Sequence, residues 1–220
     1  MKRLELRKQI IERIGIPVAE KSVLAGKIKT NYLVTDSVDV KKEITLLIHG
    51  NNPGGAVSWY PVIKSLSDYS QIIAPDVVGY GESDKPFGKY DRKFFVSWLV
   101  NFLDALQIDT VNIIGLSQGG SIALQMAIDH PDRINKLVLA DSGSLGKGMP
   151  KGAMLGFIWC NTLPSSFSRK LLNRYVANDT DKIDEIWNSY TGAVQRSFRS
   201  KLAFWLGSGK VTAHIRRATK

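Results

Sequence analysis

The chain has 220 residues, 44% of them hydrophobic, and a formal net charge of +10. A chain of this length can bury about 70% of its unfolded surface and form one domain with an appended segment. It holds no apolar run near the roughly 20 residues that span a membrane and no signal peptide, so we expect a cytoplasmic protein without a membrane span. The single cysteine, Cys160, agrees with a reducing compartment.

The positive charge is unevenly distributed along the chain. Residues 43–141 hold eleven acidic and seven basic side chains, whereas the segments on either side are basic. The middle segment, which carries the motifs discussed below, is therefore acidic. A solvated basic surface explains the outer segments, so we expect no nucleic-acid partner. Binding to nucleic acid or to an anionic membrane is the alternative, and it rests on charge alone.

The first 42 residues predict a helix and a hairpin. Apolar residues recur at helical spacing among lysines and arginines, at Leu6, Ile10, Ile11 and Ile14. This pattern indicates a short basic amphipathic helix that packs on its own domain or on a partner. Two β-like stretches follow at residues 22–25 and 27–34, and Gly26 between them predicts a hairpin.

From Ile44 onward, short apolar runs alternate with glycine-containing turns and helical stretches. The apolar runs cover residues 44–48, 71–74, 111–114 and 136–140, and the helical stretches cover residues 59–67, 92–106 and 120–127. Asp91 is placed to cap the second of these helices. Buried strands that alternate with helices predict a mostly parallel sheet in a three-layer α/β sandwich, which we assign to residues 1–143.

A different pattern begins after Ser142. Residues 144–210 contain helical patterns at 168–176, 182–190 and 195–206 with no convincing strand, which predicts a helical lid. Residues 211–220 would connect this lid to further strands of the core. Aromatic side chains of the lid are candidate walls of a substrate pocket, and packing within the lid explains them equally well: Phe157, Trp159, Trp187 and Trp205.

A G-x-S-x-G pattern occurs at Gly115-Leu116-Ser117-Gln118-Gly119. The pattern alone is weak, but here it follows a buried apolar run and opens a helical stretch. In this strand-turn-helix context a sharp turn pushes the serine out of the top of the sheet, and the two glycines avoid collisions with the neighbouring strand and helix. Ser117 is therefore the predicted nucleophile. A serine that only caps the helix is the alternative.

An acyl-transfer site also needs N–H groups that stabilise an oxyanion. The backbone N–H of Gln118, directly after the nucleophile, is one predicted donor. The second should come from a loop after an earlier strand, and residues 49–55 form a loop with glycines that let the main chain approach a ligand. We predict the N–H of Asn51 as this second donor. An ordinary Gly/Asn/Pro turn is the alternative for the loop.

Together these features resemble the α/β-hydrolase superfamily. The resemblance covers about residues 20–145 and rests on the order of four motifs, namely residues 49–50, 74–83, the serine turn and 129–133. Residues 49–54 and 141–146 are similar to those of carbon–carbon bond hydrolases that cleave ring-fission diketones. Leu116 and Gln118 are more similar to the residues of general esterases.

The resemblance implies a catalytic triad in the order Ser, Asp or Glu, His, with the last two after the seventh and eighth strands. The chain ends before those positions, so we expect a truncated chain that lacks both residues and is inactive as it stands. By the resemblance His49 is structural, while His130 ends a helix and His214 lies in the final connection, so none is the expected base. Asp141 is a candidate acid, because some related hydrolases place theirs after the sixth strand.

The sequence therefore predicts a serine hydrolase that acts on small-molecule esters, lactones or ring-fission diketones. Its expected partner is the small-molecule substrate, and we expect neither a cofactor nor a metal, since no ligand spacing for a metal or phosphate loop is present. The alternative is a non-catalytic ligand-binding or interaction module on the same scaffold, because a fold does not fix a function.

Overall fold

The computed structural model describes residues 3–36, 43–142 and 184–195, together with a few single residues between 152 and 170. Most of the predicted lid, including Phe157 and Trp205, and the final connection with His214 lie outside the described residues. Within the described part of the chain, no helix is long and apolar enough to cross a membrane.

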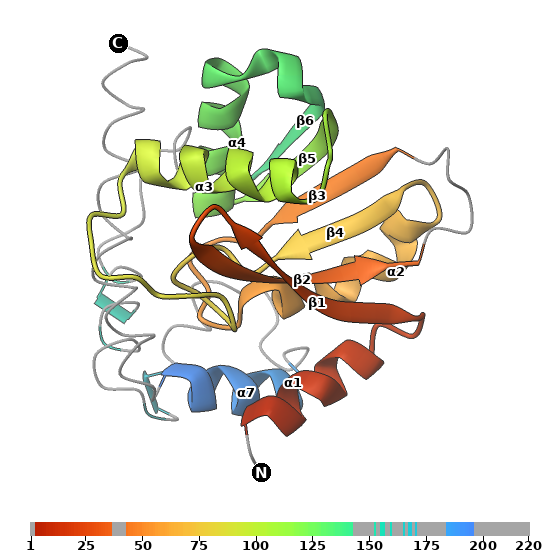
Figure 1. The fold of residues 1–220 in the computed structure, drawn as a ribbon. Helices are drawn as coiled ribbons and strands as arrows, with labels where there is room; N and C mark the ends of the chain where they lie inside the picture. Colours follow the sequence, from red (N-terminus) through yellow and green to blue (C-terminus); the bar gives the residue numbers. More distant parts are fainter. Residues whose placement is uncertain are drawn as a thin grey trace.

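A six-stranded sheet forms the centre of the molecule (Figure 1). Its strands are β1 (Val18–Ala25), β2 (Ile28–Thr35), β3 (Ile44–Ile48), β4 (Gln71–Pro75), β5 (Val111–Leu116) and β6 (Ile134–Ala140), in the spatial order β1-β2-β4-β3-β5-β6. Strands β4, β3, β5 and β6 pair in parallel, whereas β2 pairs antiparallel with β1 and β4. The predicted mostly parallel sheet is confirmed, and so is the hairpin, which turns at Gly26 with a φ of 63°.

Two long helices cover one face of the sheet, α3 (Arg92–Ala105) and α4 (Gln118–Asp129). The predicted cap of α3 is confirmed, because the Asp91 carboxylate accepts a hydrogen bond of 3.1 Å from the N–H of Phe94. The apolar stripe of α3 packs with α4 and the sheet in one hydrophobic core, which includes Phe95, Trp98, Phe102, Ile122 and Met126. Helix α4 ends at the short 3-10 turn Pro131–Arg133, as Pro131 predicts.

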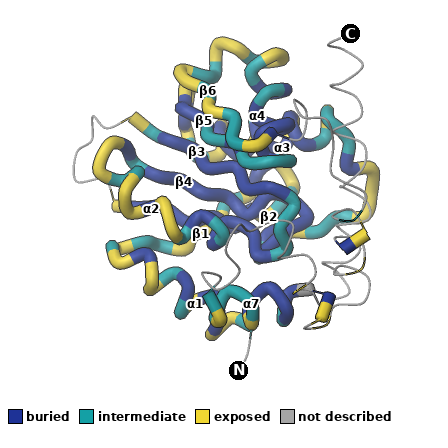
Figure 2. Tube along the Cα trace, turned by 180° about the vertical axis from the view of Figure 1, so that it is seen from behind, coloured by how far each residue is buried: buried dark blue, intermediate teal, exposed yellow. Residues whose placement is uncertain are grey.

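The other face is covered by α1 (Arg3–Glu12), α7 (Glu185–Gln195), and α2 (Tyr60–Ser67), which continues the 3-10 turn Gly55–Trp59. Figures 1 and 2 show α1 and α7 side by side beneath the sheet. The apolar face of α1 is buried there through Leu6 and Ile10, and Ile14 just beyond the helix is buried in the same core, so the predicted N-terminal helix packs on its own domain.

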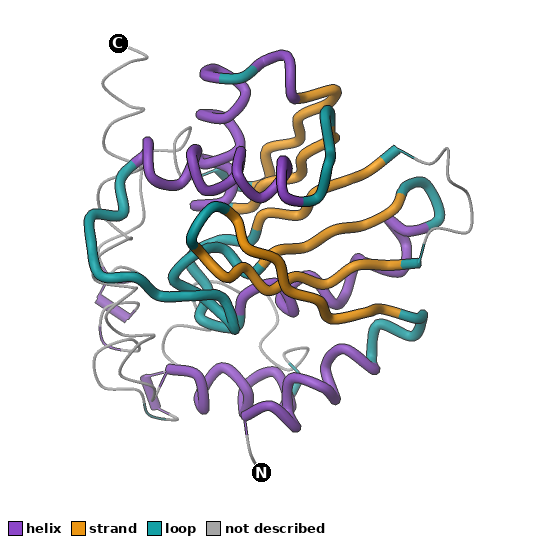
Figure 3. The backbone as a smooth tube through the Cα atoms, viewed as in Figure 1, coloured by secondary structure: helices purple, strands orange, loops and turns teal. Residues whose placement is uncertain are grey.

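Helix α7 lies inside the predicted lid but differs from the predicted bounds. The sequence pattern predicts one helix at 182–190 and another from residue 195, whereas α7 runs without a break to Gln195. Tyr190 and Val194 are both fully buried in the core that α1 and α7 share, and this packing outweighs the low helix propensity of Gly192. Figure 3 shows the helices on both sides of the sheet as three layers.

Candidate active site

Ser117 occupies the turn between β5 and α4. Its backbone has a φ of 52° and a ψ of −113°, a conformation that L-residues rarely adopt. Its N–H donates a 3.0 Å hydrogen bond to the carbonyl oxygen of Ala140, at the end of β6, which fixes the turn against the neighbouring strand. Strained backbone of this kind persists only where the surroundings enforce it, and such residues cluster at functional sites.

Glycines around Ser117 allow the close approach that this turn needs. A Cβ at Gly115 would lie 2.7 Å from the carbonyl oxygen of Gly119, and a Cβ at Gly119 would overlap the carbonyl oxygens of Ile48 and His49. The role predicted for these two glycines is therefore confirmed. A Cβ at Gly50 would lie 3.0 Å from the Cβ of Ser117, so the main chain of the 49–55 loop reaches the serine itself.

The 49–55 loop is held by its own hydrogen bonds. The N–H of Asn52 donates to the carbonyl oxygen of Gly50 at 2.7 Å, and the N–H of Gly55 donates to that of Asn52 at 3.0 Å. The Asn52 side chain also accepts a 2.8 Å bond from the N–H of Gly54. These bonds give the loop a defined shape beside Ser117.

Asn51 and Gln118, the two predicted oxyanion donors, are joined through a third residue. The Tyr80 hydroxyl lies 3.0 Å from Oδ1 of Asn51 and 3.1 Å from Oε1 of Gln118. Gln118 is also the first residue of α4, where the positive end of the helix dipole favours developing negative charge. The structure thus brings both residues to the serine turn, and their use as oxyanion donors stays a prediction.

His49 is engaged with the backbone at both ring nitrogens. Nε2 accepts a 2.9 Å hydrogen bond from the N–H of Val77, so Nδ1 carries the proton and donates to the carbonyl oxygen of Gly50 at 2.7 Å. Burial lowers the pKa of His49, an effect that Arg7 reinforces and that Asp76 and the Gly50 carbonyl oppose. A neutral, fully engaged imidazole acts as a structural link between β3 and the loop after β4.

We therefore expect the protein to become less stable as the pH is lowered from 6.5, and we attribute part of this loss in the free energy of unfolding to His49. The unfolded chain takes up a proton near the ordinary histidine pKa of 6.5, while folded His49 takes it up only at lower pH. Stability contributed by His49 is complete above pH 6.5 and is lost as the pH falls, by up to about 1.4 kcal/mol per pH unit. Urea unfolding of the parent and of His49→Gln between pH 7.5 and 5 tests this, and equal slopes would contradict it.

Asp141 lies close to the serine turn in the chain fold, whereas His130 lies away from it. Asp141 directly follows Ala140, whose carbonyl holds the serine turn; its side chain is exposed and its φ is 45°. Its role as the acid stays a prediction. His130 caps the far end of α4, about 18 Å along the helix from Ser117, which places it away from the turn.

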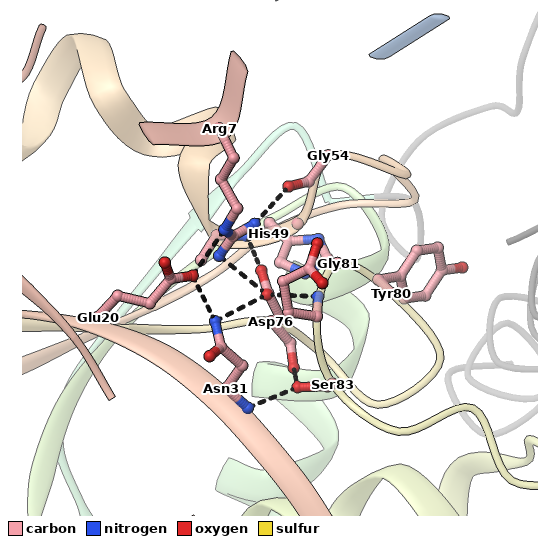
Figure 4. A network of polar contacts seen from close by, with 12 residues as sticks. Arg7, Glu20, Asn31, His49, Gly54, Asp76, Tyr80, Gly81 and Ser83 are labelled. Carbon is pink, nitrogen blue, oxygen red and sulfur yellow. Dashed lines mark hydrogen bonds and ion pairs between the residues drawn. The ribbon is translucent and has the colours of Figure 1, made fainter. Parts of the chain in front are cut away.

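Asp76, directly after β4, is fully buried between the loop after β3 and the loop after β4 (Figure 4). Its Oδ1 accepts a 2.6 Å bond from the N–H of Ala56, and its Oδ2 accepts a 2.8 Å bond from the N–H of Glu82. Gly55 and Gly81 lie so close to this carboxylate that a Cβ at either would overlap it. Asp76 thus ties together the loops after β3 and β4.

The charge of Asp76 is balanced by Arg7 of α1, whose side chain is only 1% exposed. Arg7 Nη2 donates to Asp76 Oδ2 at 3.0 Å and Nε donates to Glu20 at 2.7 Å. Its Nη1 lies 3.1 Å from the Tyr190 hydroxyl of α7 and 3.4 Å from the carbonyl oxygen of Gly54. Burial acts to lower the pKa of Arg7, but Asp76, Tyr190 and Glu20 outweigh it and the pKa is raised.

A model of the alpha/beta hydrolase fold family matches residues 44–190, which span β3 to α7 and include the serine turn. The chain belongs to the alpha/beta hydrolase fold family.

Relatives of this alpha/beta hydrolase include enzymes that act on ring-fission products. It is 33% identical over 162 residues to a 2-hydroxymuconate semialdehyde hydrolase of Pseudomonas sp. strain CF600, a match that covers 72% of this chain and 56% of the relative. A meta-cleavage product hydrolase structure from Pseudomonas fluorescens superposes with a TM-score of 0.74 at 25% identity, over 86% of this chain and 71% of that one.

Carboxylesterase CesB of Bacillus subtilis superposes with a TM-score of 0.79, over 90% of this chain and 68% of that one; at 17% identity this likeness shows the fold alone. The chain spans a little over half the length of the curated ring-fission hydrolases that it matches.

Helix α7 contacts the 49–55 loop of the alpha/beta hydrolase, a contact that the sequence does not predict. A Cβ at Gly54 would lie 2.7 Å from Cη2 of Trp187, and the Tyr190 hydroxyl donates to the carbonyl oxygen of Gly54 at 3.3 Å. Of the aromatic residues proposed as pocket walls, Trp187 therefore lies next to the 49–55 loop. Trp159 packs on Phe167 and is 43% exposed.

Proposed function

We propose that this alpha/beta hydrolase cleaves small molecules by nucleophilic attack of Ser117, with the backbone N–H groups of Asn51 and Gln118 as oxyanion donors. The single observation that carries the proposal is the backbone of Ser117, held at a φ of 52° beside the main chain of Gly50. A serine that only capped α4 would need no such backbone, and its side chain makes no capping hydrogen bond to this helix.

The proposed reaction is acyl transfer through Ser117 Oγ. As the oxygen attacks the substrate carbonyl, a general base removes its proton and the two N–H groups stabilise the negative charge on the carbonyl oxygen. The bond to the leaving group then breaks, the leaving group takes the proton from the base, and water releases the acyl group from Ser117 by the same two steps. Among the described histidines, His49 has both nitrogens engaged and His130 lies at the far end of α4. We therefore propose that the base comes from outside the described part of the chain, and that Asp141 is a candidate to orient it.

We further propose residues 1–143 as the catalytic core and residues 144–210 as a lid that shapes the substrate pocket. The packing of Trp187 and Tyr190 on Gly54 supports this division, because it brings α7 to the loop beside the nucleophile. A lid helix in this position can exclude water and contribute apolar contacts to the substrate.

Ring-fission diketones are the first substrate class that we propose, and small esters or lactones the second. The 33% identity to a 2-hydroxymuconate semialdehyde hydrolase supports this order. The test is an activity assay of the full-length protein with two substrates. One is a 2-hydroxy-6-oxo-dienoate, whose absorbance disappears on cleavage, and the other is p-nitrophenyl acetate. We expect hydrolysis of at least one, with a higher kcat/KM for the dienoate. Tight binding of either without turnover would instead favour a non-catalytic binding module.

A further inference from the structure

We propose that Tyr80 is a positioning residue of the oxyanion hole, which holds the loop of Asn51 and the turn of Gln118 at a fixed separation through its hydroxyl group. The inference rests on the proposed function of Ser117. Tyr80 does not touch the reacting atoms in this account; it acts through the two residues that do.

The position of Tyr80 is itself rigid. Its ring is buried and packs edge-on against His49, with centroids 5.5 Å apart and an interplanar angle of 85°. Its N–H donates to the carbonyl oxygen of Val77 at 2.8 Å, and the flanking Gly79 and Gly81 adopt φ values of 94° and 49° that a side chain would strain. The hydroxyl therefore projects from a turn that has little freedom to move.

The hydroxyl joins two segments that are far apart in the chain. Asn51 lies on the loop after β3 and Gln118 at the start of α4, 67 residues later, and both amide oxygens are within 3.1 Å of the same atom. A hydroxyl has one proton and donates to one amide oxygen at a time, but its oxygen can accept from the NH2 of the other amide when that amide is turned. Either arrangement gives a continuous amide–hydroxyl–amide chain.

The hydroxyl keeps its proton at every pH at which the enzyme would be assayed. Burial raises the pKa of Tyr80 well above its ordinary value of 10, and the bond to Gln118 offsets this only in part. The link between Asn51 and Gln118 is therefore independent of pH across the neutral range.

The separation of the two donors matters because oxyanion stabilisation depends on geometry. Each N–H must lie about 2.7 to 3.1 Å from the place that the oxyanion will occupy, and a misplacement of about 1 Å can cost about a hundredfold in rate. Asn51 and Gln118 each lie three residues beyond Ile48 and Gly115, which are paired in the sheet, so a further link beyond the strand ends can fix the relative position of the donors. The described structure provides one at Tyr80.

The test is Tyr80→Phe in the full-length enzyme, because phenylalanine keeps the buried ring and removes only the hydroxyl. We expect kcat to fall about 10- to 100-fold while KM changes by less than about threefold, since the donors act on the transition state rather than on bound substrate. The kcat of Asn51→Ala, which removes the linked side chain but keeps the backbone N–H, should fall similarly. This second variant decides the matter if Tyr80→Phe does not fold.

Tyr90→Phe is the matched control. Tyr90 is also buried, and its hydroxyl donates at 2.9 Å to the carbonyl oxygen of Pro86, with no hydrogen bond to the serine turn or the 49–55 loop. The control loses a buried hydroxyl of the same kind, so it should show a similar drop in melting temperature with an unchanged kcat. An equal kcat in the two tyrosine variants would overturn the inference.

A double variant that combines Tyr80→Phe with Asn51→Ala separates a positioning role of Tyr80 from a general loss of stability. If Tyr80 acts through Asn51, the effects on kcat of Tyr80→Phe and Asn51→Ala should not multiply when the two changes are combined. Fully multiplicative effects would also overturn the inference. If Ser117→Ala keeps full activity, both the proposed function and the role of Tyr80 are wrong. If Ser117→Ala is inactive and Tyr80→Phe is fully active, only the role of Tyr80 is wrong.

Discussion

Replacement of Ser117 by alanine in the full-length enzyme should lower kcat by about 10⁴-fold or more while leaving the fold intact. The change removes the attacking oxygen, and the remaining oxyanion donors sustain only a small residual rate. The side chain is half-buried in a turn, so its loss leaves no large cavity. Steady-state kinetics with the ring-fission substrate and the melting temperature measured on the same samples check both parts.

Ser67→Ala is a suitable control for this experiment. Ser67 ends α2, and its hydroxyl donates to the carbonyl oxygen of Lys64 at 2.7 Å, a local bond that does not involve the serine turn. Its removal should leave kcat unchanged. A Ser117→Ala variant with kcat near that of Ser67→Ala would show that the nucleophile is a different group.

Replacement of Arg7 by methionine should lower the free energy of unfolding by about 3 to 5 kcal/mol. Arg7 forms a direct ion pair with the fully buried Asp76, and its removal leaves that carboxylate hydrogen-bonded to two backbone N–H groups and the amide of Asn31. A buried charge without a counter-charge is costly. Urea unfolding, with the free energy extrapolated to zero denaturant, measures the loss.

Lys8→Met on the same helix separates this effect from a general effect of charge removal. Lys8 forms an exposed pair with Glu12 at 3.9 Å, and the Lys8 side chain is 72% exposed. Pairs of this kind contribute about 0 to 1 kcal/mol, so the control should stay within about 1 kcal/mol of the parent. If Arg7→Met were no more damaging than Lys8→Met, the network around Asp76 would have no special part in stability.

The Arg7 variant should also affect catalysis, because the network reaches the 49–55 loop. Arg7 contacts the carbonyl oxygen of Gly54, and Asp76 binds the N–H of Ala56 directly after the loop. Arg7→Met removes the first of these two restraints, which loosens the segment that carries Asn51. The structure thus gives α1 a role that its charge pattern does not show: it anchors the loop beside Ser117.

The elements that the sequence predicts well are those set by local patterns. The strand at residues 44–48 is confirmed with the same bounds, and the Asp91 cap and the glycines at 115 and 119 are confirmed with their predicted contacts. Each depends on periodicity, a capping residue or a steric limit within a few residues. The fold class follows from their order, since alternating buried strands and helices admit few architectures.

Contacts between distant segments could not be predicted in the same way. The pattern places Arg7 among solvated basic residues, whereas it is buried against Asp76, 69 residues later in the chain. One signal was available: Arg7 precedes Ile10, Ile11 and Ile14 by three, four and seven residues, so it shares their face of the helix. The hydroxyl of Tyr80 gives no such signal, because its partners lie on the loop after β3 and at the start of α4.

The central claim, that Ser117 is an activated nucleophile, is tested most directly by covalent labelling. A fluorophosphonate probe added to the full-length enzyme should form an adduct, and peptide mass spectrometry should place it on Ser117. Labelling should be lost in Ser117→Ala and kept in Ser67→Ala. An adduct on another residue, or labelling of Ser117→Ala as strong as that of the parent, would contradict the account.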